Sequence, residues 1–479
     1  MNKSNVVSRG MLFLLFSKAY FLVSGYIIYI VLTRLLGPNL FGIYGVVIGL
    51  VSTISMVFIG GINQATSKFI SEQSSCASSI KKSSFELQAF MGTAAFLLFF
   101  FFSPVIAGLF NDKSLAVYFR ITAPIILFYS FYGVFVGYTN GTKQFKKQAL
   151  LEVAYCTIKT ILISILVFFG FSLVGAFGGF IIATLLIFVI SIILFGVTDK
   201  GPGFPKLKIL KFQVWIMLQT LIINLILNID LFLLKALTPV QDTANFYAGI
   251  YNAALTIARI PYLAVIPLSY VIFPFISEAT HKQDAFLTRR YIVKCMRYSV
   301  IFLTLFVVLI STNAQGIIKL LYSEDYAAGA MSLSIVSTGM MFFSLLVITT
   351  TFISGSGLPK VSIAITGGIF MVDFILNYLF IPVWGTVGAA AATTISMGLG
   401  FLVSAVYVKG RFKVFLPFYS FLKIVVLAGI LFILSLFMKA GGFLLILKLV
   451  LLSIGYVIVL LALKEITLVT RIPFLMLKE

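Results

Sequence analysis

The chain has 479 residues, of which 61% are hydrophobic and only 10% are charged, and its mean hydropathy is +1.13. A soluble domain would carry about a quarter charged residues, so the composition excludes a soluble enzyme or a soluble binding domain. The net charge of +21 could suggest nucleic acid as a partner, but the basic residues lie in loops beside apolar segments, where the positive-inside rule accounts for them.

Apolar segments long enough to cross a bilayer follow one another along the chain with short gaps. We therefore expect an all-α polytopic membrane protein with about fourteen transmembrane helices. In chain order the predicted spans are 11–34, 42–64, 86–109, 117–139, 150–170, 173–197, 213–237, 245–275, 296–319, 327–353, 361–382, 386–408, 421–440 and 443–463. With the N-terminus inside, most Lys and Arg residues fall in cytoplasmic loops. This predicts a multi-pass protein of the cell membrane with both termini cytoplasmic.

The sequence also repeats itself. Phe-Ile-Ser-Glu at 69–72 recurs at 275–278, and Gly-Ile-Tyr at 42–44 recurs at 249–251. The offset is nearly the same for both motifs, and the order is kept. Duplicated halves are how many transporters build a central site that opens to either side of the membrane, so the repeats indicate a transporter.

The repeats divide the chain into predicted domains. Residues 1–200 and 205–410 would each form a six-helix bundle, and an even number of spans per half predicts a pseudo-twofold axis along the membrane normal. The two spans in 420–465 have no counterpart and would be appended helices. The tail 466–479 mixes apolar and charged residues and is expected to be cytoplasmic or interfacial.

Charge within a predicted span is costly and usually faces a polar interior. The charged residues singled out for a lumenal position are Lys18, Lys159, Arg259, Asp230 and Asp373. Three basic residues near mid-membrane suit an anionic ligand such as a diphosphate, because its removal from water needs compensating cations. The two carboxylates could balance this charge or bind a coupling Na⁺ or H⁺. Two other interpretations stay open: Lys18 could snorkel to the headgroups, and Asp230 could pair structurally with Arg259.

Neutral polar residues add to the predicted lumen. They are Asn224, Asn228, Asn252 and Asn377. The last lies four residues after Asp373, so these two side chains should share a helix face. Interhelical hydrogen bonds are an equally good account of the asparagines.

Neither catalytic residues nor a metal site nor a cofactor is predicted. His281 is the only histidine and lies in a predicted cytoplasmic loop, and three cysteines on the reducing side imply no disulfide framework. A polytopic polymerase or glycosyltransferase would need a large outer loop or a carboxylate pair. Only the adjacent Glu324 and Asp325 form such a pair, so we do not expect an enzyme.

Several motifs resemble those of polysaccharide-biosynthesis flippases. They are Thr-Arg-Leu-Leu-Gly-Pro at 33–38, Phe-Gly-Ile-Tyr at 41–44, Asp230 followed by the segment 248–254, and Gly-Thr-Val-Gly-Ala at 385–389. On these motifs the chain is identified as a member of the polysaccharide transporter (O-antigen-type flippase) branch of the multidrug/oligosaccharidyl-lipid/polysaccharide (MOP) exporter superfamily. The resemblance implies two six-helix bundles that face each other across a central cavity, often with two extra helices, and alternating access.

The resemblance also implies a cargo, an undecaprenyl- or dolichyl-diphosphate oligosaccharide. A polysaccharide polymerase or glycosyltransferases would then be partners, together with membrane lipids. Arg34 matches the family's first-hairpin motif but lies at the predicted outer mouth, where capping or headgroup contact is as good an account as cargo binding. Lys18, Lys159, Arg259 and Arg34 are therefore the candidate cargo-binding residues.

The predicted function is a flippase that moves a polyprenyl-diphosphate-linked oligosaccharide from the cytoplasmic to the outer leaflet for cell-surface glycan synthesis. A multidrug or organic-cation antiporter of the same fold is an alternative, although basic residues outnumber acidic ones in the predicted lumen. A lipid II flippase is a close alternative, since its cationic cavity would look alike.

Overall fold

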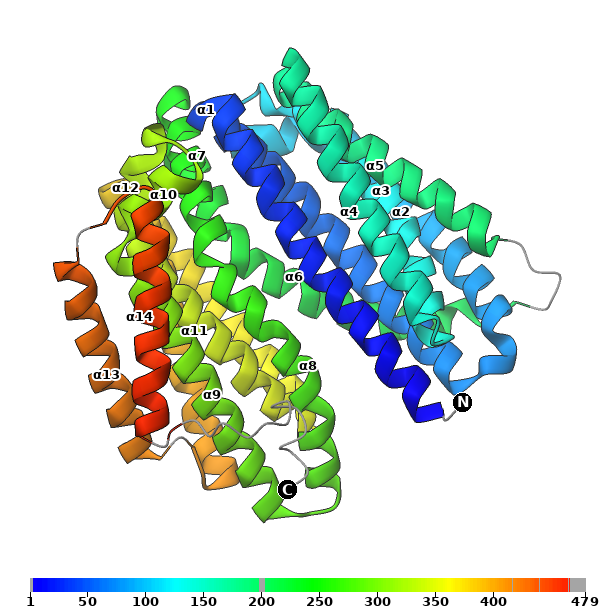
Figure 1. The fold of residues 1–479 in the computed structure, drawn as a ribbon. Helices are drawn as coiled ribbons and strands as arrows, with labels where there is room; N and C mark the ends of the chain where they lie inside the picture. Colours follow the sequence, from blue (N-terminus) through cyan, green and yellow to red (C-terminus); the bar gives the residue numbers. More distant parts are fainter. Residues whose placement is uncertain (1–2, 198–202, 416, 439, 464, 466–479) are drawn as a thin grey trace. The chain divides into compact units, whose positions relative to one another are not determined.

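A computed structural model describes residues 3–197, 203–415, 417–438, 440–463 and 465, and within these ranges the regular structure is entirely helical (Figure 1). The predicted tail 466–479 lies outside the described residues. The main helices are α1 (Lys3–Glu72), α2 (Ala77–Leu109), α3 (Leu115–Gly141), α4 (Phe145–Leu166), α5 (Ser172–Phe195), α6 (Lys206–Leu237), α7 (Gln241–Ala258), α8 (Ile260–His281), α9 (Ala285–Thr312), α10 (Ala314–Leu321), α11 (Ala330–Gly355), α12 (Pro359–Phe412), α13 (Phe418–Phe437) and α14 (Phe443–Ala462). Short turns join some of them: η1 (Ser74–Cys76), η2 (Val167–Phe171) and η3 (Glu324–Gly329).

Three of the longest helical stretches are hairpins. The stretch Phe16–Glu72 has 57 residues, which would extend about 85 Å if straight, far beyond the roughly 30 Å of hydrocarbon in a bilayer. It turns at Gly37, whose φ of 72° lies in the left-handed region that glycine adopts without strain. The rings of Tyr29 and Phe41 consequently lie 6.1 Å apart on opposite arms.

The other two hairpins turn at Gly170, between α4 and α5, and at Gly385, within α12. Eleven described stretches are long and apolar enough to span a membrane, and three of them are hairpins, so they account for fourteen spans. The predicted all-α polytopic fold is confirmed.

Two predicted spans differ from the structure. The span 245–275 is two helices, α7 and α8, which are separated at Arg259. Pro261 lacks the N–H that would donate to the preceding turn, which favours this break. The outer end of the span 296–319 is likewise a separate helix, α10, which begins after Asn313.

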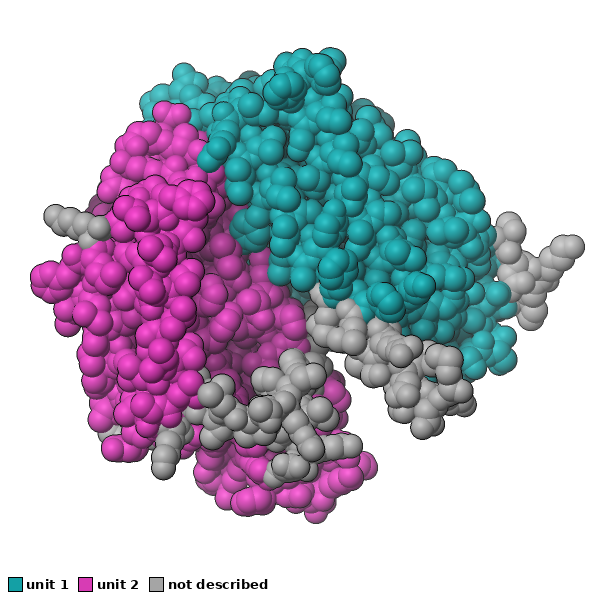
Figure 2. Space-filling view, in the orientation of Figure 1, with its two compact units in different colours: residues 1–249 teal, residues 250–479 magenta. Residues whose placement is uncertain are grey.

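The described chain forms two compact units, residues 1–249 and 250–479 (Figure 2). The division falls inside α7, which is one continuous helix. Helix α6 belongs to the first unit, because it packs against α1. The bundles predicted from the repeats, 1–200 and 205–410, stay a prediction.

Glycines let α1 approach α7 closely within the first unit. A methyl group at Gly42 would overlap the carbonyl oxygen of Asn245, and one at Gly249 would overlap the carbonyl oxygen of Pro38. Gly42 and Gly249 are the first residues of the repeated Gly-Ile-Tyr motif, so the two copies of the motif meet at this crossing.

Buried polar contacts fasten α13 and α14 to α9 in the second unit. Near one end of α14, the Lys448 amino group donates to the Asn313 side chain and to the Ser435 carbonyl, at 2.5 and 2.7 Å. Beyond the other end, the Glu465 carboxylate pairs with Lys423 at 3.1 Å. Helices α13 and α14, which have no counterpart in the predicted repeat, are thus part of this unit.

We expect Gly42→Ala to destabilise the protein by about 1–3 kcal/mol, because a buried methyl group with no room forces the backbones of α1 and α7 apart. Thermal unfolding of the detergent-purified protein measures this. Gly178→Ala is the matched control, since nothing lies within 4 Å of a methyl group there. Equal melting temperatures for the two variants would contradict the close packing.

Candidate functional site

A cavity of about 170 Å³ lies within the first unit, between α1, α3, α4 and α5. Its wall is mostly apolar and aromatic, with hydroxyl groups from Ser52 and Ser55 and from several tyrosines. The lining residues are Phe21, Gly25, Ile28, Tyr29, Tyr44, Ile48, Ser52, Ser55, Met56, Ile125, Tyr129, Tyr155, Lys159 and Phe180. Among these residues Lys159 alone carries a charge. Its role in binding cargo stays a prediction.

Aromatic rings surround the amino group of Lys159. Its nitrogen lies 5.5 Å from the ring centre of Phe21 and 5.1 Å from those of Tyr155 and Phe180. Such cation–π contacts partly replace hydration, but they leave the positive charge uncompensated. Within the described residues Lys159 forms no ion pair with a carboxylate. The cavity can therefore accept an anionic group.

Lys18 lies near this cavity and has an acidic partner. Its amino group is 2.8 Å from the carboxylate of Glu152 on α4. The same carboxylate accepts hydrogen bonds from Ser17, at 2.8 Å, and from Gln148, at 3.4 Å. Glu152 was not predicted as a site residue, although it falls inside the predicted span 150–170, where an acidic residue is itself a signal.

Among the polar residues of α6, Asn228 contacts α1, and the others make hydrogen bonds within α6. Asn228 donates to Thr53 of α1, at 3.4 Å, and to the carbonyl of Asn224. Asn224 in turn donates to the carbonyl of Thr220. Asp230 is fully buried, and its carboxylate accepts the backbone N–H of the next residue, Leu231. None of these predicted lumen residues lines the cavity around Lys159.

The remaining predicted residues lie elsewhere. Asp373 and Asn377 are fully buried on α12 and lie 3.1 Å apart, on one helix face as their spacing predicts. Arg259 lies between α7 and α8, and Asn252 is buried on α7. These four residues belong to the second unit, whereas Lys18 and Lys159 belong to the first. A single cationic cavity that contains all the basic residues stays a prediction.

Arg34 is exposed near the end of the first arm of the α1 hairpin, three residues before the turn at Gly37. It does not line the cavity around Lys159. A cargo-binding role for Arg34 therefore stays a prediction.

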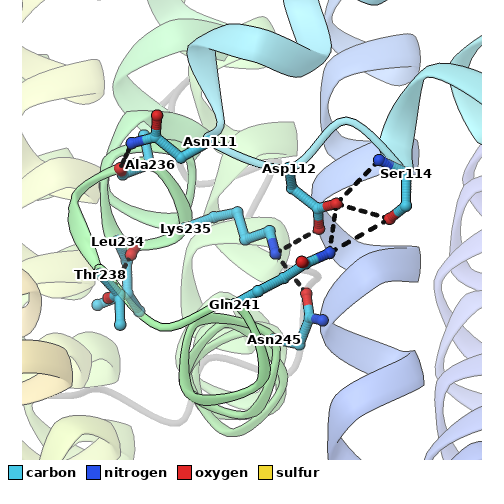
Figure 3. Close-up of polar contacts among 9 residues, drawn as sticks. All are labelled: Asn111, Asp112, Ser114, Leu234, Lys235, Ala236, Thr238, Gln241 and Asn245. Carbon is cyan, nitrogen blue, oxygen red and sulfur yellow. Dashed lines mark hydrogen bonds and ion pairs between the residues drawn. The ribbon is translucent and has the colours of Figure 1, made fainter.

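A buried ion pair joins the α2–α3 loop to α6 and α7 (Figure 3). Lys235 lies 2.7 Å from Asp112, and the side chains of both are almost completely buried. Asn245 accepts a further hydrogen bond from Lys235, while Gln241 and Ser114 donate to Asp112. Burial alone would raise the pKa of Asp112, but the hydrogen bonds and the charge of Lys235 hold this pKa below its ordinary value.

This ion pair was not predicted. With the N-terminus inside, the alternation of the predicted spans puts both residues at the outer side, but nothing in the local pattern pairs positions 112 and 235. The available signal was only that two charges of opposite sign lie at the same predicted side of the membrane.

A second cavity, of about 440 Å³, lies within the second unit and is almost entirely apolar. Helices α9, α10 and α14 and the junction of α7 and α8 form it. The lining residues are Ile257, Ile260, Leu305, Phe306, Leu309, Ile310, Ile317, Leu320, Leu321, Ile446, Leu449, Val450, Ser453 and Ile454. Its apolar lining suits a hydrocarbon chain.

Comparisons with known proteins agree with this architecture. The sequence pattern of a family described as "Polysaccharide biosynthesis protein" matches residues 7–280. An uncharacterized membrane protein of Methanocaldococcus jannaschii, MJ1375, is 22% identical over 419 residues, which cover 82% of this chain and 96% of that protein.

Two solved structures share the fold. The lipid II flippase MurJ, in an inward closed conformation, superposes with a TM-score of 0.74 at 18% identity and covers 94% of this chain and 97% of its own. A multidrug resistance MATE family transporter of the MOP superfamily, in an inward-facing conformation, also has a TM-score of 0.74, at 15% identity over 83% of this chain and 94% of its own. The expected MOP-type fold is thereby confirmed.

We expect Asp112→Asn to lower the free energy of unfolding by about 3–5 kcal/mol, because it leaves the charge of Lys235 buried without a carboxylate. Glu278→Gln is the matched control, since its ion pair with Lys282 is exposed and should contribute little. Thermal unfolding at neutral pH compares the two variants.

The same pair predicts a pH dependence. Because the pKa of Asp112 is lowered in the folded protein, its contribution is complete above the ordinary carboxyl value of about 4 and is lost as the pH falls through the lower native pKa. The difference in melting temperature between wild type and Asp112→Asn should therefore shrink at acidic pH. A constant difference would contradict the assignment.

Proposed function

Since the chain belongs to the polysaccharide biosynthesis protein family, we propose that it is a flippase for a polyprenyl-diphosphate-linked oligosaccharide. The cargo would pass from the cytoplasmic to the outer leaflet of the cell membrane by alternating access, for cell-surface glycan synthesis. The observation that carries the proposal is the cationic, aromatic-walled cavity around Lys159.

The cavity suits a diphosphate for an electrostatic reason. A positive charge that has left water without a carboxylate partner is costly in a low-dielectric interior. An entering diphosphate would supply the missing negative charge through short, charge-assisted hydrogen bonds. Serine and tyrosine hydroxyls in the same wall would donate to the remaining oxygens.

The apolar cavity of the second unit supports the lipid part of the proposal. Among its lining residues only Ser453 carries a polar side-chain group, so the cavity offers a prenyl chain a surface without desolvation cost. The contacts of Lys448 and Glu465 hold α14, one of its walls, in place.

We also propose that two buried carboxylates balance charge or couple transport to Na⁺ or H⁺. Asp230 and Asp373 are fully buried carboxylates within helices, a position suited to charge balance or to binding Na⁺ or H⁺. A glycosyltransferase would supply the cargo on the inner side, and a polysaccharide polymerase or a further transferase would consume it outside. No catalytic role is proposed for this chain.

A second candidate is a lipid II flippase, because lipid II also carries a diphosphate on a polyprenyl chain and the similar MurJ structure bears that name. An organic-cation antiporter is disfavoured by Lys159, since its charge would repel a cation from the aromatic wall.

We expect Lys159→Ala to slow translocation of a fluorescent polyprenyl-diphosphate oligosaccharide in liposomes by tenfold to a hundredfold. The loss of a charged hydrogen bond of about 1.5–3 kcal/mol accounts for this. Lys159→Arg should retain part of the rate, and Lys282→Ala, at an exposed position of the chain, should retain all of it. Unchanged transport by Lys159→Ala would refute the cationic site, and cation efflux by the same liposomes would favour the antiporter.

A further inference from the structure

The contact between Lys18 and Glu152 is unequal. The side chain of Lys18 is 60% exposed, whereas that of Glu152 is only 10% exposed. The carboxylate is therefore held inside the first unit, and the lysine reaches it from a position that is open to other groups. A ligand could approach the lysine without moving α4.

Glu152 is stabilised independently of Lys18. Ser17 donates to one carboxylate oxygen at 2.8 Å, and Gln148, one turn earlier on α4, lies 3.4 Å from the other. If Lys18 swings away, the carboxylate still keeps two hydrogen-bond donors. The ion pair can thus open without leaving a buried carboxylate unsatisfied, which is the usual reason that such pairs stay closed.

The pair also lies beside the cavity. Glu152 and Lys159 are seven residues apart on α4, which is two helical turns or about 10 Å, so they share a helix face. On α1, Lys18 is one turn before Phe21, whose ring faces Lys159. Tyr20 and Thr157, whose hydroxyl groups are 2.8 Å apart, join the two helices between these positions.

We propose that Glu152 is an internal counterion that competes with the anionic cargo for Lys18 and so sets how many anionic groups the cargo must carry. A diphosphate has two phosphoryl groups, so one displaces the carboxylate from Lys18 while the other reaches toward Lys159. A monophosphate or a carboxylate has a single anionic group and does not engage both lysines. This inference rests on the proposed function, and it adds a selectivity residue to that site.

The competition has a measurable consequence. The apparent dissociation constant of a ligand is inversely proportional to the fraction of time that its binding group is free. If Glu152 occupies Lys18 about nine-tenths of the time, its neutralisation should tighten anion binding about tenfold. A purely structural clamp between α1 and α4 predicts the opposite sign, because its weakening would loosen the site.

Binding of farnesyl diphosphate and farnesyl monophosphate to the full-length protein in nanodiscs tests this. We expect Glu152→Gln to bind the diphosphate about tenfold more tightly than wild type. Its affinity for the monophosphate should rise by a larger factor than its affinity for the diphosphate. The gain should vanish in the double variant Glu152→Gln, Lys18→Gln. Glu86→Gln is the matched control, since it neutralises an exposed acid that pairs with Lys206.

Weaker binding by Glu152→Gln together with a lower melting temperature would overturn the inference in favour of a structural clamp. Equal binding by wild type and Glu152→Gln, or a gain that survives in the double variant, would overturn it while leaving the proposed function intact. Absence of diphosphate binding to every variant would instead refute the proposed function itself.

If Glu152→Gln fails to fold, Glu152→Asp provides the second test. Its shorter side chain should weaken the contact with Lys18 and give a smaller gain in affinity. No gain would again overturn the inference.

Discussion

The hydrocarbon interior of a membrane supplies no water to polar groups, and the rest of this structure follows from that constraint. Every backbone N–H and C=O in the bilayer must be satisfied within the protein, so the described residues form helices. A reversal of the chain needs a residue whose backbone leaves the helical conformation, and glycines such as Gly37 adopt such a conformation in the hairpins. The close crossing at Gly42 and Gly249 uses glycine differently, for space.

The same constraint gives each buried charge a recognisable environment. Asp112 neutralises Lys235, which also donates a hydrogen bond to Asn245. The charges of this pair are therefore balanced within the protein, and the pair stabilises the packing of the helices. Lys448 is surrounded by neutral oxygens, and Glu465 by cationic and hydroxyl donors, and both fasten α13 and α14. Lys159 differs because aromatic rings surround it without neutralising it. Under the proposed function, that difference makes Lys159 available to a ligand, whereas the other charges stabilise the fold.

Under the proposed function, the two cavities would divide the chemistry of an amphipathic cargo. The cavity of the first unit offers positive charge and hydroxyl groups, and that of the second offers almost only hydrocarbon. A lipid-linked diphosphate has both parts in one molecule. The internal pairing of Lys18 with Glu152 would then let the site rest without cargo at little electrostatic cost, and would reserve it for strongly anionic headgroups.

The sequence by itself determined the class of protein and the number of spans, because hydropathy and turn glycines are local properties of the chain. It also placed Lys159 correctly within a span and Asn377 on the helix face of Asp373. Only the tertiary structure decided which charges meet. The partners in Lys18–Glu152 and Asp112–Lys235 are more than a hundred residues apart, and no local pattern specifies how one helix packs on another. The break at Arg259 was missed for a related reason: an apolar run looks continuous in hydropathy even where Pro261 interrupts the helix.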